Sequence, residues 1–141
     1  MIIWNENLDE VRKVTPDKEM AKSLLEMINL RFEYLEKVDS EKFTTLLVEG
    51  YYEIIKEAIT ALMNIYGYKT TSHEILIGFL AHFYKDKFSS TEIYFLDRLR
   101  KLRNDIEYRG VFIKKDFWER NSTIIFKIIE KLKRILENKL G

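Results

Sequence analysis

Hydrophobic residues recur every three or four positions along most of this chain, and that spacing predicts helices. The first helix is expected after an N-cap and proline at Thr15-Pro16 and runs to about Val38. The second helix has the clearest pattern, with apolar positions from Phe43 to Ile65. Gly67 follows it and suits a left-handed C-terminal cap.

The second half of the chain is divided by similar signals. Thr71–Glu74 and Ser89–Glu92 both have a hydroxyl residue followed three positions later by glutamate, the pattern of a capping box. The first box predicts a short apolar helix to about Lys85, and the second predicts a helix that ends at Gly110. A last helix is expected from about 114–116 to the end of the sequence.

Short connections force neighbouring helices to run antiparallel. The sequence therefore predicts an all-α fold, an up-and-down bundle of about five helices in a single domain over residues 1–141. Residues 1–14 are ambiguous, and Ile2, Ile3 and Trp4 either cap the core or dock on a partner. Gly50 interrupts the second helix, which indicates either a close helix crossing or a ligand or partner that approaches the backbone.

Composition narrows the class of protein. Of the 141 residues, 46% are hydrophobic and 33% are charged, which excludes a disordered chain. Cysteine is absent, so disulfides, thiolate metal sites and cysteine nucleophiles are excluded. The longest apolar run, 75–81, is far below the roughly 20 residues of a membrane span, and the N-terminus lacks a signal-peptide pattern. We therefore expect a cytoplasmic protein without a membrane partner.

Abundant Lys, Glu, Ile and Tyr and the absence of glutamine are compatible with a heat-adapted source or with codon bias.

Charge is unevenly distributed along the chain. The totals almost balance, at 24 basic and 23 acidic residues. Residues 98–115, however, contain only two acidic residues and seven basic ones: Arg98, Arg100, Lys101, Arg103, Arg109, Lys114 and Lys115. Such a cluster is either a solvated helix face or a surface for a phosphate-bearing partner.

Arg103 stands out because it falls within about 50° of the middle of an apolar stripe on the fourth helix. The stripe consists of Leu96, Leu99, Leu102 and Ile106. A guanidinium keeps its proton, so it must be paired or must line an interface or cleft. One interpretation pairs it with Glu49, Glu53 or Glu57 of the second helix or lets it reach solvent. The other holds it at a pocket edge for a phosphate, which its forked donors match.

The run from Leu99 to Gly110 resembles the signature of HEPN domains, small helical domains named for higher eukaryotes and prokaryotes nucleotide-binding. Their mark is an arginine, commonly followed by a polar residue such as asparagine, and then a histidine near the end of a late helix. Arg103 and Asn104 match the opening of this motif, and Tyr108 stands in place of the histidine. The helical order and the long last helix are also similar to the family.

The resemblance implies a homodimer that binds RNA or a nucleotide at a cationic cleft between its subunits. The contacts would come from Arg100, Arg103, Arg109 and Lys114. Many members are metal-independent ribonucleases of toxin–antitoxin or defence systems, in which the arginine stabilises charge on the phosphate and the histidine assists attack by the ribose hydroxyl. By position, the catalytic roles carry over to Arg103, Asn104 and Tyr108.

Tyrosine ionises near pH 10 and is a poor proton carrier at neutral pH, so the sequence leaves enzyme activity open. The alternative is a non-catalytic interaction module that partners a minimal nucleotidyltransferase. In toxins with such partners, a tyrosine two places after the histidine is adenylylated. Gly110 occupies that place here, and Tyr108 is a speculative substitute. A third interpretation is a structural bundle in which the basic cluster has no role.

The two histidines are the remaining candidates for acid–base chemistry. His73 is expected to be exposed near the start of the third helix, and His82 is expected at the edge of the core. Either replaces the missing histidine only if the fold brings it to Tyr108. Positions 103 and 108 lie about 140° apart on a regular helix. No spacing of His, Asp and Glu predicts a metal site, no motif predicts a cofactor, and most aromatic residues are expected in the core.

Overall fold

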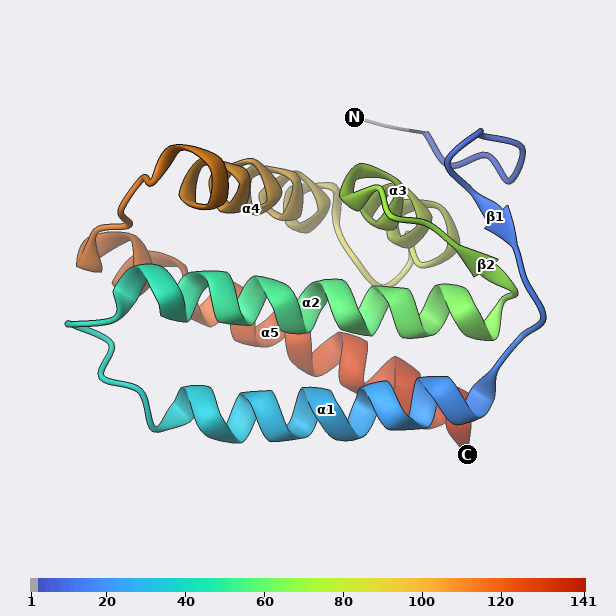
Figure 1. Cartoon of the computed structure of the whole chain (residues 1–141), viewed down its shortest axis with the longest axis horizontal. Helices are drawn as coiled ribbons and strands as arrows, with labels where there is room; N and C mark the ends of the chain where they lie inside the picture. The colour runs from blue at the N-terminus through green and yellow to red at the C-terminus, as the bar shows by residue number, and fades with distance from the viewer. Residues whose placement is uncertain (1–2) are drawn as a thin grey trace.

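A computed structural model describes residues 3–141. Its elements, in chain order, are β1 (Arg12–Lys13), α1 (Lys18–Glu36), α2 (Thr44–Ile65), β2 (Tyr68–Lys69), α3 (His73–Phe83), α4 (Ser90–Arg109) and α5 (Lys115–Leu140) (Figure 1). Neighbouring long helices run antiparallel, as α1 and α2 do along one side of the molecule. The predicted all-α bundle of five helices is confirmed for the described part of the chain.

The second helix lies at the centre of the bundle. It packs against α1, α3, α4 and α5, and most of its residues are buried. Its apolar residues cover most of its circumference and are buried, whereas its charged residues, such as Glu49 and Glu53, stay partly exposed along one side. The other four helices pack around α2 and bury apolar residues against the same core. The five elements therefore share one core, and α4 and α5 are held on opposite sides of the groove described below.

The start of the first helix differs from the prediction. The N-cap is Asp17, whose carboxylate accepts a hydrogen bond from the Met20 amide at 3.0 Å, so the predicted cap at Thr15-Pro16 is wrong. The physical reason is the strand pair: Arg12 lies opposite Lys69, and the Val14 amide donates to the Gly67 carbonyl at 2.9 Å. These bonds keep the backbone extended up to the helix.

One of the two predicted capping boxes is present. Ser89 and Glu92 bond to each other's backbone amides at 2.9 and 3.1 Å, which confirms the box that starts α4. The box at Thr71–Glu74 is wrong, because the cap of α3 is Ser72, whose hydroxyl accepts from the Ile75 amide at 3.3 Å. Both predicted helix-ending glycines, Gly67 and Gly110, have positive φ values, 85° and 64°.

The N-terminal arm covers the core. Trp4 is buried, with its ring 5.2 Å from Tyr68 and 5.3 Å from Phe79, so it caps the core. Ile3 is exposed, and Ile2 lies outside the described residues. The sequence did not predict the short strand pair, since two-residue strands are too short to show an alternating pattern.

Gly50 marks a close crossing of α1 over α2. A Cβ atom at this position would lie 2.8 Å from Leu35 Cδ2, closer than real side chains approach. The predicted close helix crossing is therefore confirmed. Gly50 also lines the groove that contains Arg103.

Candidate functional site around Arg103

Arg103 is held near the end of the bundle where α1 and α4 end and α2 begins. It projects from α4 toward the other two helices, and its side chain is only 19% exposed. It lines a groove of about 340 Å³, which we call the Arg103 groove, formed by Arg31, Tyr34, Leu35, Leu46, Glu49, Gly50, Glu53, Arg103 and Glu107. The apolar stripe of α4 is buried against the bundle, and Arg103, which lies on the same face of the helix, is partly buried with it.

Within one chain, the Arg103 groove contains two arginines and three glutamates. Arg103 Nη2 lies 4.0 Å from Glu107 Oε2, an ion pair too long to be a hydrogen bond. Arg31 pairs instead with Glu57, at 3.1 Å, so one of the predicted partners of Arg103 belongs to another arginine. Arg103 is thus surrounded by carboxylates but tightly bound to none of them.

Two of these carboxylates lie against each other. Burial raises the pKa of Glu49, and the neighbouring Glu107 raises it further through a hydrogen bond and through charge repulsion. Arg103 opposes this shift by attraction, but less strongly. Glu49 therefore takes up a proton at a higher pH than a free glutamate does, and its protonation makes the groove less negative.

Exposed apolar side chains surround the groove. Tyr34 and Leu46 line it and are 69% and 58% exposed. The apolar surface continues around the turn between α1 and α2, where Phe43 and Val38 border a second hollow that also contains Tyr34 and Leu46. Single exposed apolar residues are normal, but a continuous patch beside a half-buried charge is typical of an interaction surface.

His73 is less exposed than the sequence predicted. Its ring is half-buried, and Nδ1 lies 3.1 Å from the hydroxyl of Tyr52 on α2. Burial lowers the pKa of His73, and the nearby charges of Lys56, Arg103 and Arg100 lower it further. The prediction of an exposed histidine is therefore wrong, because α3 packs its first turn against α2. The other histidine, His82, is exposed with its ring against Phe83.

The motif residues do not all face the same way. Helix α4 stays helical to Arg109, so regular geometry turns Tyr108 to another face of the helix from Arg103. Tyr108 is 77% exposed, whereas Asn104 is half-buried beside Arg103 in sequence. His73 and Tyr52 both lie close enough to Arg103 for its charge to lower their pKa values, although burial dominates the shift of each.

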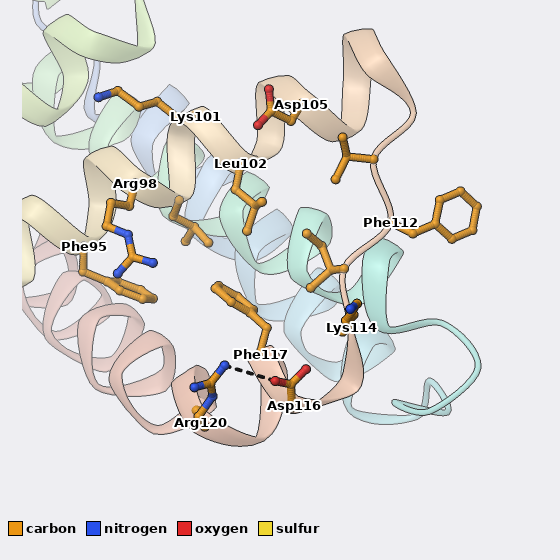
Figure 2. A pocket seen from close by; sticks show the side chains of 13 residues that line it. Phe95, Arg98, Lys101, Leu102, Asp105, Phe112, Lys114, Asp116, Phe117 and Arg120 are labelled. Atoms are coloured by element: carbon orange, nitrogen blue, oxygen red, sulfur yellow. Dashed lines mark hydrogen bonds and ion pairs between the residues drawn. The ribbon is translucent and has the colours of Figure 1, made fainter.

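The basic cluster of residues 98–115 is divided among several surfaces. Arg100 is 12% exposed and pairs with Asp97 at 3.0 Å and with Glu74 at 3.8 Å. Arg109 lies at the exposed end of α4 and pairs with Asp105 at 3.5 Å. The cationic residues on the other side of α4 line a separate groove against α5, which Figure 2 shows: Arg98, Lys101, Lys114 and Arg120.

Sequence reasoning missed Arg120 because it lies outside the basic run and reaches this groove only through the packing of α5 on α4. It also did not anticipate the half-buried His73. The apolar run that follows position 73 was a signal for this burial, since residues 75–80 of α3 are all buried.

Among residues 3–141, no group of three or more His, Asp or Glu side chains is arranged to hold a metal ion. In the same part of the chain, no helix has the length and apolar character needed to cross a membrane. The chain matches no protein-family model, no curated protein and no solved structure. The function must therefore be inferred from the site itself.

Proposed function

We propose that this protein is a HEPN-like homodimer that binds RNA or a nucleotide at a cleft around Arg103. The observation that carries the proposal is the setting of the Arg103 guanidinium, which is largely removed from water yet has only a 4.0 Å ion pair within residues 3–141. A charge held in that way is costly unless something else pairs with it. A phosphate supplies that partner, because its oxygens match the forked donors of arginine.

A second copy of the chain accounts for the apolar rim. Tyr34 and Leu46 are large, exposed and next to Arg103, and a partner subunit would remove them from water. In a two-fold symmetric dimer the same surface is used by both subunits, so a contact over this rim brings two Arg103 side chains into one cleft. The two arginines then bind one anion together, and their combined positive charge offsets the negative charge of the nearby glutamates.

The glutamates tune the strength of binding. In the free protein Glu107 lies closest to Arg103, and an incoming phosphate competes with it for the guanidinium. The raised pKa of Glu49 favours uptake of a proton when an anion approaches. We therefore expect binding that strengthens as the pH falls and weakens with added salt.

Binding does not require a proton carrier, but cleavage of RNA does. Tyr108 faces away from Arg103 along a regular helix, an observation that favours a second candidate function. In this alternative the chain is a non-catalytic module that partners a minimal nucleotidyltransferase and presents the Arg103 groove to it. Ribonuclease activity then requires a proton carrier other than Tyr108, and His73, whose pKa the charge of Arg103 helps to lower, is one candidate.

The test of the proposal is RNA binding by the purified protein, without metal, with a fluorescent single-stranded RNA. We expect Arg103→Ala to weaken binding about tenfold or more and to reduce the salt dependence. Arg134→Ala, which removes an exposed arginine of α5, is the matched control and should bind like the wild type. Equal binding by the Arg103→Ala and wild-type proteins would overturn the proposal.

The same mixtures, sampled over time on a denaturing gel, separate the two candidate functions. Cleavage that is lost in Arg103→Ala indicates a ribonuclease. Intact RNA that is bound through Arg103 indicates a binding protein without cleavage activity.

A further inference from the structure

A second groove lies between α4 and α5, on the other side of α4 from Arg103. It has a volume of about 560 Å³, within the range of ligand-binding pockets. We call it the α4–α5 groove. Its lining comes from residues 95–105 of α4, from residues 111–114 of the connection and from the first turns of α5. Its floor is apolar and formed by Phe95, Leu99, Leu102, Ile113 and Phe117.

The charges of this groove are complementary to an anionic partner. Both of its carboxylates already have partners, because Asp116 pairs with Arg120 at 3.0 Å and Asp105 pairs with Arg109 at 3.5 Å. Arg98 and Lys114, in contrast, form no ion pair with any residue of 3–141. In Figure 2 the guanidinium of Arg98 points into the groove beside Phe95, while Lys114 stands on the connection opposite.

Phe112 adds an exposed apolar group at the rim. Its side chain is 86% exposed and extends from the connection into solvent, away from the floor (Figure 2). Gly110, with a φ of 64° and no atom within 4 Å of its Cβ position, begins this connection. The protein thus holds a large ring in water next to a hollow with apolar walls, although burying that ring would be favourable.

We propose that the α4–α5 groove binds an acidic peptide segment of a partner protein, with one large apolar side chain of the segment on the floor. Carboxylates on either side of that apolar residue would pair with Arg98 and Lys114, and Phe112 would fold over the segment. This inference does not rest on the function proposed for Arg103, which uses a different face of α4.

An acidic peptide fits this groove better than a nucleic acid does. Single-stranded RNA is held by several exposed aromatic faces and a continuous cationic track. Here only Phe112 presents an open ring, Phe95 is 7% exposed, and Lys101 is already paired with Asp97 at 3.4 Å. An apolar floor between two separated cations suits an aliphatic or aromatic side chain flanked by carboxylates.

The experiment is selection of a displayed library of random 12-residue peptides on the intact protein. Peptides that bind the wild type are counter-selected on the Arg98→Glu/Lys114→Glu variant, in which two exposed residues are changed and the core is untouched. We expect enrichment of sequences with a large apolar residue between acidic ones. An enriched peptide, made synthetically, should bind the double variant about tenfold or more weakly than the wild type.

Lys127→Glu is the matched control, since it reverses an exposed charge of α5 outside the groove, and it should bind the peptide like the wild type. Leu102→Ala, which removes part of the floor, should also weaken binding, and circular dichroism is used to check that this variant folds. Three results would overturn the inference: no enrichment that depends on Arg98 and Lys114, enrichment of basic peptides, or displacement of the peptide by single-stranded RNA that itself requires these two residues.

Discussion

The Arg103 groove and the α4–α5 groove each take a cation from α4, Arg103 in one and Arg98 in the other, and yet they have opposite characters. On the Arg103 side the carboxylates outnumber the arginines, and the apolar groups lie on the rim. On the α5 side both carboxylates are paired, two cations form no ion pair within residues 3–141, and the apolar groups form the floor. The comparison teaches that a basic run in a sequence is not one surface, because a helix turns by about 100° per residue.

The difference also separates two kinds of partner. A half-buried arginine beside exposed Tyr34 and Leu46 is suited to an interface between subunits that encloses an anion. An open hollow with cations at its edges, such as the α4–α5 groove, is suited to reversible binding of a peptide segment. Four predictions test this contrast, from the largest expected effect to the smallest.

Replacing Leu46 by glutamate should prevent association of the protein. The change puts a charge into the apolar rim of both subunits, so we expect the dissociation constant of the dimer to rise about a hundredfold. Phe112→Glu changes a more exposed residue at the other groove and should leave the dimer intact. Sedimentation velocity over a range of concentrations measures both. Dissociation in Phe112→Glu and not in Leu46→Glu would reverse the assignment of the two surfaces.

Removing one carboxylate from each groove should strengthen a different interaction. Glu107→Gln frees Arg103 from its 4.0 Å partner, and we expect RNA to bind about threefold more tightly. Asp116→Asn frees Arg120 from its 3.0 Å partner and should strengthen binding of the acidic peptide, with RNA binding unchanged. Fluorescence anisotropy with each probe compares the two variants.

The pH dependence of RNA binding tests the role of Glu49 in the Arg103 groove. Glu49 has a raised pKa, so it gains a proton as the pH falls from neutral, and RNA affinity should rise over that range. The rise should be smaller in Glu49→Gln. An equal rise in both proteins would show that Glu49 is not the group that titrates.

The smallest effect is expected for His73, on the Arg103 side of α4. Its pKa is lowered from 6.5 in the folded state, so the unfolded chain binds the proton more readily. The free energy of unfolding should therefore fall as the pH drops through 6.5, and His73→Gln should reduce that fall. Urea unfolding between pH 5 and 8 measures it, with His82→Gln as the matched control. An unchanged pH dependence in His73→Gln would contradict the buried setting of this ring.

Local signals in the sequence were enough to locate most of the fold. The apolar spacing from Phe43 to Ile65 predicted α2 to within one residue, and the glycines at 67 and 110 predicted where helices end. Such signals depend on residues a few positions apart, so they can be recognised in the sequence before the fold is known. The cap at Asp17 escaped them, because it depends on strand pairing with residues 67–69 that are distant in sequence.

The candidate site shows the same division. Periodicity alone placed Arg103 on the inner side of its helix, and the structure has it 19% exposed. Which group it would meet could not be read from the sequence, because Glu49, Glu53 and Glu57 lie on one helix at similar spacing. The packing of α1 on α2 places Glu57 beside Arg31, which pairs with it. The ion-pair partner of Arg103 is instead Glu107, four residues further along α4.

By itself, the sequence determined that the chain forms helices, where they end and which faces are apolar, since these follow from backbone geometry and the aversion of apolar side chains to water. Only the tertiary structure decided which charges lie together. It divided one basic run between two grooves, added Arg120 from α5, and turned His73 toward Tyr52. Electrostatic interactions depend on distance in space, and that distance is set by how the helices pack.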